Sequence, residues 1–323
     1  MSWIDEFVEL LFPIDAKNLK IEPAYMLKQQ NLPRSVFKYR GVNEYSLANL
    51  RDNQVWLADP KTFNDPYDCS VFVDLDAMAD ASFKSPPNEL LQLMRTRFPP
   101  EIVDTFQAAV TGSDNPFEAL VNAVATELPA DQRPGIATAL KEAFSQVNRQ
   151  YAVRNSDRFK EAFKVCSFSE RVDSTLMWAH YANYHKGFCV EYSMEGFTPS
   201  DPLTRFMYPV IYAEHPFNAT ESIQTVGTAS HNNLYLNKAG LIKSTDWAYE
   251  KEWRLIISNG LLKSAQSFGM PTPKCVYLGS HITPEDQQKI LEICHSKGVP
   301  VRKMKHSPGV FAMQAAEVEN VAL

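Results

Sequence analysis

The stretch that decides the expected fold is Val165-Cys-Ser-Phe-Ser-Glu-Arg-Val-Asp-Ser-Thr-Leu-Met-Trp-Ala-His-Tyr-Ala-Asn-Tyr-His-Lys-Gly-Phe-Cys-Val-Glu-Tyr192. Residues that favour strands cluster at its two ends, in 165–168 and 187–192, whereas 175–184 contains no helix breaker. The pattern predicts a strand, a helix of about three turns and a second strand. Asp173 or Ser174 is suited to cap the start of this helix.

The predicted helix carries aromatic and imidazole side chains. Trp178, Tyr181 and His185 are spaced i, i+3 and i+7, so a helix would place them on one face. A polar aromatic face between two strands favours the lining of a pocket, but aromatic residues at helical spacing are also typical of a core. Both interpretations stay open from this stretch alone.

The composition is typical of a soluble globular protein. The chain has 323 residues, of which 45% are hydrophobic and 22% are charged. A net charge of −6 argues against nucleic-acid binding through a broad basic surface, although a local basic patch is compatible with it. Five scattered cysteines without a CxxC pair predict reduced, mostly buried thiols in a cytoplasmic protein.

Neither a membrane span nor a targeting peptide is expected from the sequence. Apolar runs fall short of the length that crosses a bilayer, and the N-terminal segment carries carboxylates where a secretory signal carries positive charge. We therefore expect no membrane partner.

The rest of the chain predicts one α+β domain over residues 1–323. Residues 1–33 read as a helical extension, and 86–163 as an insertion of four amphipathic helices, because strand signals resume directly after it. Residues 270–323 predict a strand, a helix and a strand, with Thr283 as the helix cap.

A turn motif precedes the insertion, in Lys61-Thr-Phe-Asn-Asp-Pro-Tyr-Asp68. Asn and Asp side chains bond nearby backbone amides, and proline fixes φ, so these residues could serve only to shape the turn. The alternative is that Asn64, Asp65 and Asp68 face the same pocket as the aromatic helix.

Two glutamates are spaced i, i+2 in Tyr249-Glu-Lys-Glu-Trp-Arg254. On a strand, Glu250 and Glu252 would share one face, roughly 7 Å apart. Carboxylates this close raise each other's pKa, so a site that keeps both favours chemistry, whereas a solvated edge strand is the alternative. The chain has no glycine-rich phosphate loop and no histidine spacing typical of a metal site, and we expect no metal.

Six motifs in one order resemble a widespread bacterial domain-of-unknown-function family, number 2971. The resemblance covers about residues 37–257, apart from the helical insertion. The motifs are Phe37-Lys-Tyr-Arg40, Phe63-Asn-Asp-Pro-Tyr-Asp68, Cys166-Ser-Phe-Ser169, Met177-Trp-Ala-His-Tyr-Ala182, His185-Lys-Gly-Phe-Cys189 and Tyr249-Glu-Lys-Glu-Trp-Arg-Leu255.

A looser resemblance is to the ADP-ribosyltransferases of the arginine-serine-glutamate type. An early strand with Arg40, a second strand with Ser-x-Ser and a late strand with Glu-x-Glu are similar to their signature. The resemblance implies a split, mostly antiparallel sheet whose cleft holds NAD as the substrate. The middle motif departs from the usual Ser-Thr-Ser because it reads Ser-Phe-Ser, and the aromatic helix and the Asn-Asp-Pro motif have no obvious counterpart in the simplest transferases.

The transferase resemblance implies roles for individual residues. Arg40 would meet the dinucleotide phosphates, for which a guanidinium is well suited. Glu252 would stabilise the positive charge that develops on the ribose as the nicotinamide bond breaks, and Glu250 would orient or deprotonate the acceptor. We expect Glu252→Gln to abolish turnover with little loss of stability.

Further candidates surround these three residues. Trp178 or Tyr181 would stack on a ring of the nucleotide, and His180 would bond a ribose hydroxyl. The other cofactor-binding candidates are Tyr39, Asn64, Asp65, Ser167, Ser169 and Arg254, with the two serines beneath the cleft.

The leading prediction is therefore transfer of ADP-ribose from NAD to an unknown macromolecular acceptor, in the setting of a bacterial toxin or phage-defence effector that the resemblance implies. One alternative is a catalytically silent module that senses a nucleotide or binds a protein through the same cleft. A second is a phosphodiester hydrolase or nuclease that uses His180, His185, Asp65 and Asp68, which would require these groups to converge around a metal. The acidic net charge makes nucleic acid a possible but not a favoured partner.

Overall fold

The computed structural model describes residues 2–74, 100–111, 159–225, 228–258 and 266–318. It also describes the isolated positions 77, 95–96, 113, 115, 118–119, 122, 138 and 142. The chain divides into two compact units. The first comprises Met1–Ser70, Phe159–Pro216 and Asn232–Leu323, and the second comprises Val71–Arg158 and Phe217–His231.

The second unit contains most of the predicted helical insertion. Its helix α6 spans Pro100–Thr111, within the range for which the sequence predicted four helices. The other three predicted helices lie largely outside the described residues. The short strands β3 (Val71–Phe72) and β8 (Phe217–Asn218) pair in parallel within this unit.

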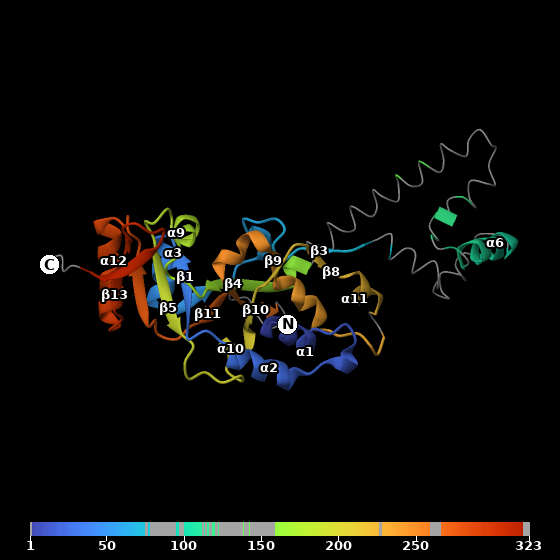
Figure 1. Cartoon of the computed structure of the whole chain (residues 1–323), viewed down its shortest axis with the longest axis horizontal. Coiled ribbons are helices and arrows are strands. Elements are labelled where there is room, and N and C mark those ends of the chain that lie inside the picture. Colours follow the sequence, from blue (N-terminus) through green and yellow to red (C-terminus); the bar gives the residue numbers. More distant parts are fainter. Residues whose placement is uncertain are drawn as a thin grey trace. The chain divides into compact units, whose positions relative to one another are not determined.

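The first unit is built on an eight-stranded sheet with the order β14-β13-β12-β5-β1-β4-β10-β6 (Figure 1). Every neighbouring pair is antiparallel except β12 and β13, which confirms the prediction of mixed helices and a mostly antiparallel sheet. The strands are β1 (Ser35–Arg40), β4 (Phe163–Ser169), β5 (Phe188–Ser193), β6 (Met207–Pro209), β10 (Glu252–Ser258), β12 (Cys275–Leu278), β13 (Val301–His306) and β14 (Met313–Glu317).

The sheet is weakly joined at its centre. β1 pairs with β5 along its whole length, and β10 pairs with β4 along its whole length. Between these two ladders, β1 and β4 meet at the single register position Phe37↔Ser169. Backbone pairing therefore leaves room between β1 and β4 for side chains and for a pocket.

The helix α9 (Thr175–Tyr181) packs against β1 (Figure 1). Ser174 caps it, because its hydroxyl accepts a hydrogen bond from the Met177 amide at 3.3 Å. The predicted helix reached residue 184 but ends earlier. Asn183, Tyr184 and His185 take positive φ angles of 46°, 55° and 65°, which are left-handed and cannot continue a right-handed helix.

This turn corrects the prediction for His185. Because the chain leaves the helix after Tyr181, the His185 ring does not share the face of Trp178 and Tyr181. It packs instead against His306, with ring centroids 5.2 Å apart.

Other helices follow their sequence signals. α1 (Trp3–Leu11) and α2 (Ile21–Gln30) form the N-terminal extension, and α3 (Glu44–Arg51) begins at an Asn43 capping box with Ser46. α12 (Pro284–Ser296) starts at the Thr283 cap and connects β12 to its parallel neighbour β13. The first unit also contains the helix α10 (Pro202–Phe206) and the 3₁₀ helices η1 (Ala16–Asn18), η2 (Pro60–Thr62), η3 (Tyr235–Gly240) and η4 (Thr245–Glu250). Two further strand pairs belong to it, β2 (Gln54–Trp56) with β11 (Ser267–Gly269) and β7 (Ile211–Ala213) with β9 (Ile242–Ser244). The second unit also has the helix α11 (Thr220–Gln224).

Apolar side chains are buried on both faces of the large sheet. Phe168, Phe188 and Leu255 belong to one cluster, while Tyr39 and Trp178 belong to another. All five cysteines fall within the described residues, where they are buried and form no disulfide, as the sequence predicted. In the described part of the chain, no helix combines the length and the apolar character that a bilayer span requires.

Candidate functional site

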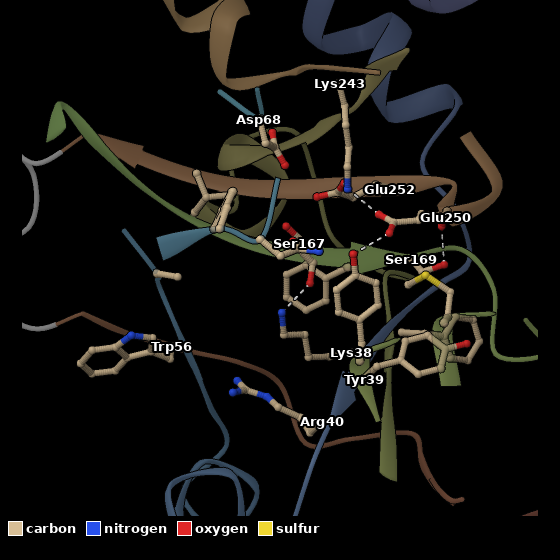
Figure 2. Close-up of a pocket in the computed structure, with 18 residues that line it drawn as sticks. Lys38, Tyr39, Arg40, Trp56, Asp68, Ser167, Ser169, Lys243, Glu250 and Glu252 are labelled. Atoms are coloured by element: carbon tan, nitrogen blue, oxygen red, sulfur yellow. Dashed lines mark hydrogen bonds and ion pairs between the residues drawn. The ribbon is translucent and has the colours of Figure 1, made fainter. Parts of the chain in front are cut away.

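A pocket of about 240 Å³ opens where β1 and β4 separate (Figure 2). Its walls come from β1, β2, β4, α9, β9, η4 and the first residue of β10, together with the Asn-Asp-Pro turn. The lining residues are Phe37, Lys38, Tyr39, Arg40, Trp56, Ala58, Phe63, Asn64, Asp68, Val165, Ser167, Phe168, Ser169, Met177, Tyr181, Lys243, Glu250 and Glu252.

The two glutamates of the Glu-x-Glu motif both line this pocket, but they do not lie on one strand as predicted. Glu250 is the last residue of η4, and Glu252 is the first residue of β10. Lys251 between them has a left-handed φ of 44°, which turns the chain from the 3₁₀ helix into the strand. The alternative of a solvated edge strand is also wrong, because β10 is paired on both sides and Glu252 is buried.

Lys243 brings the two carboxylates together. Its Nζ lies 2.6 Å from Glu250 Oε2 and 2.8 Å from Glu252 Oε2 (Figure 2). All three side chains are buried, so water screens these charges poorly. The shared ammonium offsets the repulsion that two neighbouring carboxylates would otherwise have.

The two carboxylates differ in their acidity. Burial acts to raise the pKa of Glu252, but the positive charges of Arg254 and Lys243 outweigh it and hold that pKa well below the ordinary value of 4.5. Burial raises the pKa of Glu250, and the charge of Glu252 adds to this effect against the opposing charge of Lys243. The site therefore keeps Glu252 ionised and makes Glu250 the easier of the two to protonate.

Arg254 holds Glu252 from behind. The guanidinium is 0% exposed. Its Nε donates to Glu252 Oε1 at 2.8 Å, its Nη2 to Asp68 Oδ2 at 2.8 Å and its Nη1 to the Gly240 carbonyl at 2.8 Å. The sequence made Arg254 a cofactor-binding candidate, whereas the structure engages its guanidinium with protein groups.

Lys38 and Arg40 form a second wall of opposite charge. They stand two residues apart on β1, so both project to the same side of the strand. Lys38 Nζ donates to the Ser167 carbonyl at 2.7 Å, across the gap between β1 and β4. Burial is the main cause that lowers the pKa of Lys38, and the neighbouring charge of Arg40 acts in the same direction.

Arg40 has a buried nitrogen without a partner. Its Nη2 is enclosed and makes no hydrogen bond, and no ion pair of Arg40 occurs among the described residues. Figure 2 shows the guanidinium on the side of the pocket that also carries Trp56, away from the glutamates. Arg40 as a whole is half-buried, but an enclosed donor without an acceptor is unfavourable, so this wall is suited to bind an anion.

Ser169 and Tyr181 hold Glu250 in place. The Ser169 hydroxyl donates to the Glu250 carbonyl at 2.6 Å and accepts from the Arg171 amide at 3.0 Å, which ties β4 to the turn before β10. The Tyr181 hydroxyl donates to Glu250 Oε1 at 2.7 Å. Burial, followed by the charge of Glu250, raises the pKa of Tyr181, so this hydroxyl keeps its proton.

The other candidate residues lie in three places: the pocket, the core and the surface. Tyr39 lines the pocket, and its hydroxyl donates to the Arg171 carbonyl at 2.7 Å. Trp178 is 0% exposed and packs edge-on against Tyr39, with centroids 5.2 Å apart, so its indole belongs to the core. His180 is exposed, and its ring lies 6.5 Å from that of Trp247.

The Asn-Asp-Pro turn serves both purposes considered for it. Asn64 and Asp68 line the pocket, while the Asp65 carboxylate accepts from the Tyr67 amide at 2.8 Å and shapes the turn. The four groups of the hydrolase hypothesis lie in different surroundings, because Asp68 pairs with Arg254 and Asp65 shapes the turn. His180 is exposed, and His185 packs against His306. Within the described residues, no group of three or more His, Cys, Asp or Glu side chains is arranged to hold a metal ion.

Half of the lining residues were not candidates from the sequence, and three of these, Lys38, Lys243 and Trp56, matter for the chemistry of the pocket. Lys38 could have been found, because it alternates with Arg40 on one strand. No sequence pattern marks Lys243 or Trp56 as a site residue. Lys243 reaches the glutamates because η4 folds the chain back between them, and Trp56 resembles any aromatic residue in a short strand.

In comparison with known proteins, residues 177–255 match a family model. That range is narrower than the predicted 37–257. It includes Tyr181, Lys243 and both glutamates, but not β1 with Lys38 and Arg40. No curated protein and no solved structure matches the chain. Over residues 177–255 the chain is therefore similar to the family described as "Protein of unknown function (DUF2971)".

Proposed function

We propose that this protein binds NAD and transfers ADP-ribose from it to a macromolecular acceptor. The observation that carries the proposal is a single pocket with an unpartnered guanidinium at one side and two carboxylates of different acidity at the other. The resemblance to ADP-ribosyltransferases assigns functions to the same residues, Arg40 and the Glu-x-Glu pair. A toxin or phage-defence role stays a prediction from that resemblance.

The cationic wall would bind the pyrophosphate. Arg40 supplies a planar guanidinium whose buried Nη2 lacks an acceptor, and Lys38 adds an ammonium on the same side of β1. Phosphate oxygens would accept charge-assisted hydrogen bonds from both of these groups. The nicotinamide ribose would then extend toward Glu250 and Glu252.

In the transfer step, the bond between the ribose C1′ and the nicotinamide nitrogen breaks. The electron pair leaves with the nicotinamide, which becomes neutral, and positive charge develops on the ribose. An acceptor lone pair forms the new bond to C1′, and the acceptor loses one proton. The chemistry therefore needs one carboxylate that stays negative beside the ribose and one group that can take up a proton.

The two glutamates are suited to these separate tasks. Glu252 stays ionised because Arg254 and Lys243 hold it so, which fits electrostatic stabilisation of the ribose cation. Glu250 has the raised pKa, which fits a base that receives the acceptor's proton. Neighbouring carboxylates with pKa values displaced in opposite directions are a general sign of divided roles.

The test measures free nicotinamide after incubation of the full chain with NAD and a cell lysate. We expect release by the native protein and loss of release in Glu252→Gln. Because Glu252 is buried and bonded to two cations, the structure revises the expectation of little stability loss, and Glu252→Gln should lower the melting temperature.

The matched control is Glu191→Gln. Glu191 is another buried carboxylate on a central strand, bonded to Ser35 and Tyr277 and not part of the pocket lining. It should lose stability but keep nicotinamide release. Equal activity in the native protein and Glu252→Gln would contradict the catalytic role, and absence of NAD binding by the native protein would contradict the proposed function as a whole.

A second candidate function is a silent nucleotide-binding module. It is favoured by the engagement of Glu252, whose two oxygens already meet Arg254 and Lys243. For this module we expect NAD to raise the melting temperature of the native protein without any nicotinamide release.

A further inference from the structure

We propose that Trp56 is a stacking platform for the adenine ring of NAD, so that the site selects a dinucleotide over a mononucleotide. This inference rests on the proposed function and deepens it with a residue outside the resemblance motifs. It is carried by the exposure of Trp56, by its place in the pocket and by the size of the cavity.

Trp56 is an exposed indole at the rim of the pocket. It lies at the end of β2, where it pairs with Ser267 of β11, and its side chain is 49% exposed although it lines the cavity. The β-ladder fixes its backbone, so the ring is presented from a rigid element. An indole held half in water offers a flat apolar surface that a nucleobase can cover.

The order of groups along the pocket matches the order of groups in a dinucleotide. Figure 2 shows Glu250 and Glu252 on one side, Arg40 and Trp56 on the other, and Lys38 between them. With the nicotinamide ribose at the carboxylates and the pyrophosphate at Lys38 and Arg40, the next part of the ligand reaches Trp56. In NAD that part is adenosine.

The cavity is too small to enclose the whole dinucleotide. Its volume of about 240 Å³ is below the roughly 300–1,000 Å³ of typical pockets for drug-sized ligands. One nucleotide half would occupy the enclosed part, and the other half would lie across the rim. Trp56 is the exposed large apolar side chain in this lining.

The experiment is isothermal titration calorimetry of the full chain with NAD and with nicotinamide mononucleotide, which lacks the adenosine monophosphate half. Native protein, Trp56→Ala and Trp56→Phe are compared, with Tyr45→Ala as the matched control because Tyr45 is an exposed aromatic outside the pocket. We expect Trp56→Ala to weaken NAD binding by on the order of tenfold and to leave mononucleotide binding unchanged. Trp56→Phe should recover most of the loss, and Tyr45→Ala should behave as native.

Several results would contradict the proposal that Trp56 is a stacking platform. Unchanged NAD affinity in Trp56→Ala would mean that the indole serves another purpose, such as contact with a protein acceptor, while the proposed function would stand. If Trp56→Ala weakened the binding of NAD and of the mononucleotide equally, Trp56 would instead shape the enclosed part of the pocket. If the native protein bound neither ligand, the proposed function would fail and this inference with it.

Discussion

The two charged walls of the pocket are built in opposite ways. On the carboxylate wall, Glu252 meets Lys243 and Arg254, and Arg254 also meets Asp68, so every one of these buried charges has a partner of opposite sign. On the cationic wall, Arg40 has a buried nitrogen without any acceptor. The difference teaches that the folded chain pairs the buried charges of one wall by itself and leaves a donor of the other wall without an acceptor, which is what the proposed anionic ligand would supply.

Their positions in the sheet explain this difference. β10 is paired with β4 on one side and β6 on the other, so charges at its start are enclosed and must be matched by the protein. β1 meets β4 at one register position, and the space beside it is the pocket. A cation beside this pocket can therefore stay without an acidic partner at a smaller energetic cost than one enclosed in the sheet.

The largest expected effect is on the carboxylate wall. Arg254→Met removes the cation that joins Glu252 to Asp68 and leaves two buried carboxylates without their main partner. We expect the free energy of unfolding to fall by about 3–5 kcal/mol. Urea denaturation followed by circular dichroism measures it.

The control for this substitution is Arg302→Met. Arg302 faces Glu317 at 3.7 Å, but their side chains are 49% and 86% exposed, so the change should be below about 1 kcal/mol. Similar losses for the two variants would show that the carboxylate wall is not a buried charge network.

On the cationic wall we expect the reverse pattern. Arg40→Leu removes an unpartnered buried donor, so the free energy of unfolding should stay within about 1 kcal/mol of native. Binding of ADP-ribose, measured by calorimetry, should weaken roughly tenfold to a hundredfold, because charge-assisted hydrogen bonds are lost.

Arg51→Leu is the matched control, since Arg51 is exposed at the end of α3 and does not line the pocket. It should bind ADP-ribose as the native protein does. The proposed difference between the walls would be wrong if Arg40→Leu lost as much stability as Arg254→Met while its affinity for ADP-ribose stayed that of the native protein.

The smallest effect concerns pH. The pKa of Glu252 is lowered in the folded state, so its charge stabilises the fold above the ordinary value of 4.5 and this contribution is lost as the pH falls below it. Glu250 has a raised pKa and acts in the opposite direction, so Glu252→Gln is compared in the Glu250→Gln background. There, the destabilisation by Glu252→Gln should be roughly 1 kcal/mol smaller at pH 4 than at pH 6.

Urea unfolding at the two pH values measures this difference. The same comparison with Gln314→Ala, a substitution at an exposed position of β14, should show no pH dependence of this kind. A destabilisation by Glu252→Gln that grew on acidification would contradict the lowered pKa and the role given to Arg254 and Lys243.

Local signals predicted those elements whose ends are set by neighbouring residues. The Thr283 cap and the Ser174 cap start their helices where the sequence places them. Predictions were wrong where the backbone leaves its default conformation. Lys251 and His185 take left-handed φ angles that tertiary contacts must stabilise, and each moved a candidate residue away from the element expected for it.

By itself, the sequence determined many of the helices and strands, the buried thiols and the identity of half of the pocket-lining residues, because periodicity, caps and motifs act over a few neighbouring positions. The tertiary structure alone decided that Lys243 bridges Glu250 and Glu252, that Arg254 turns inward to Asp68 and that Arg40 stays without an acid. These outcomes depend on strand order and on the gap between β1 and β4. Charges distant in sequence are paired or left open by the sheet that brings them together.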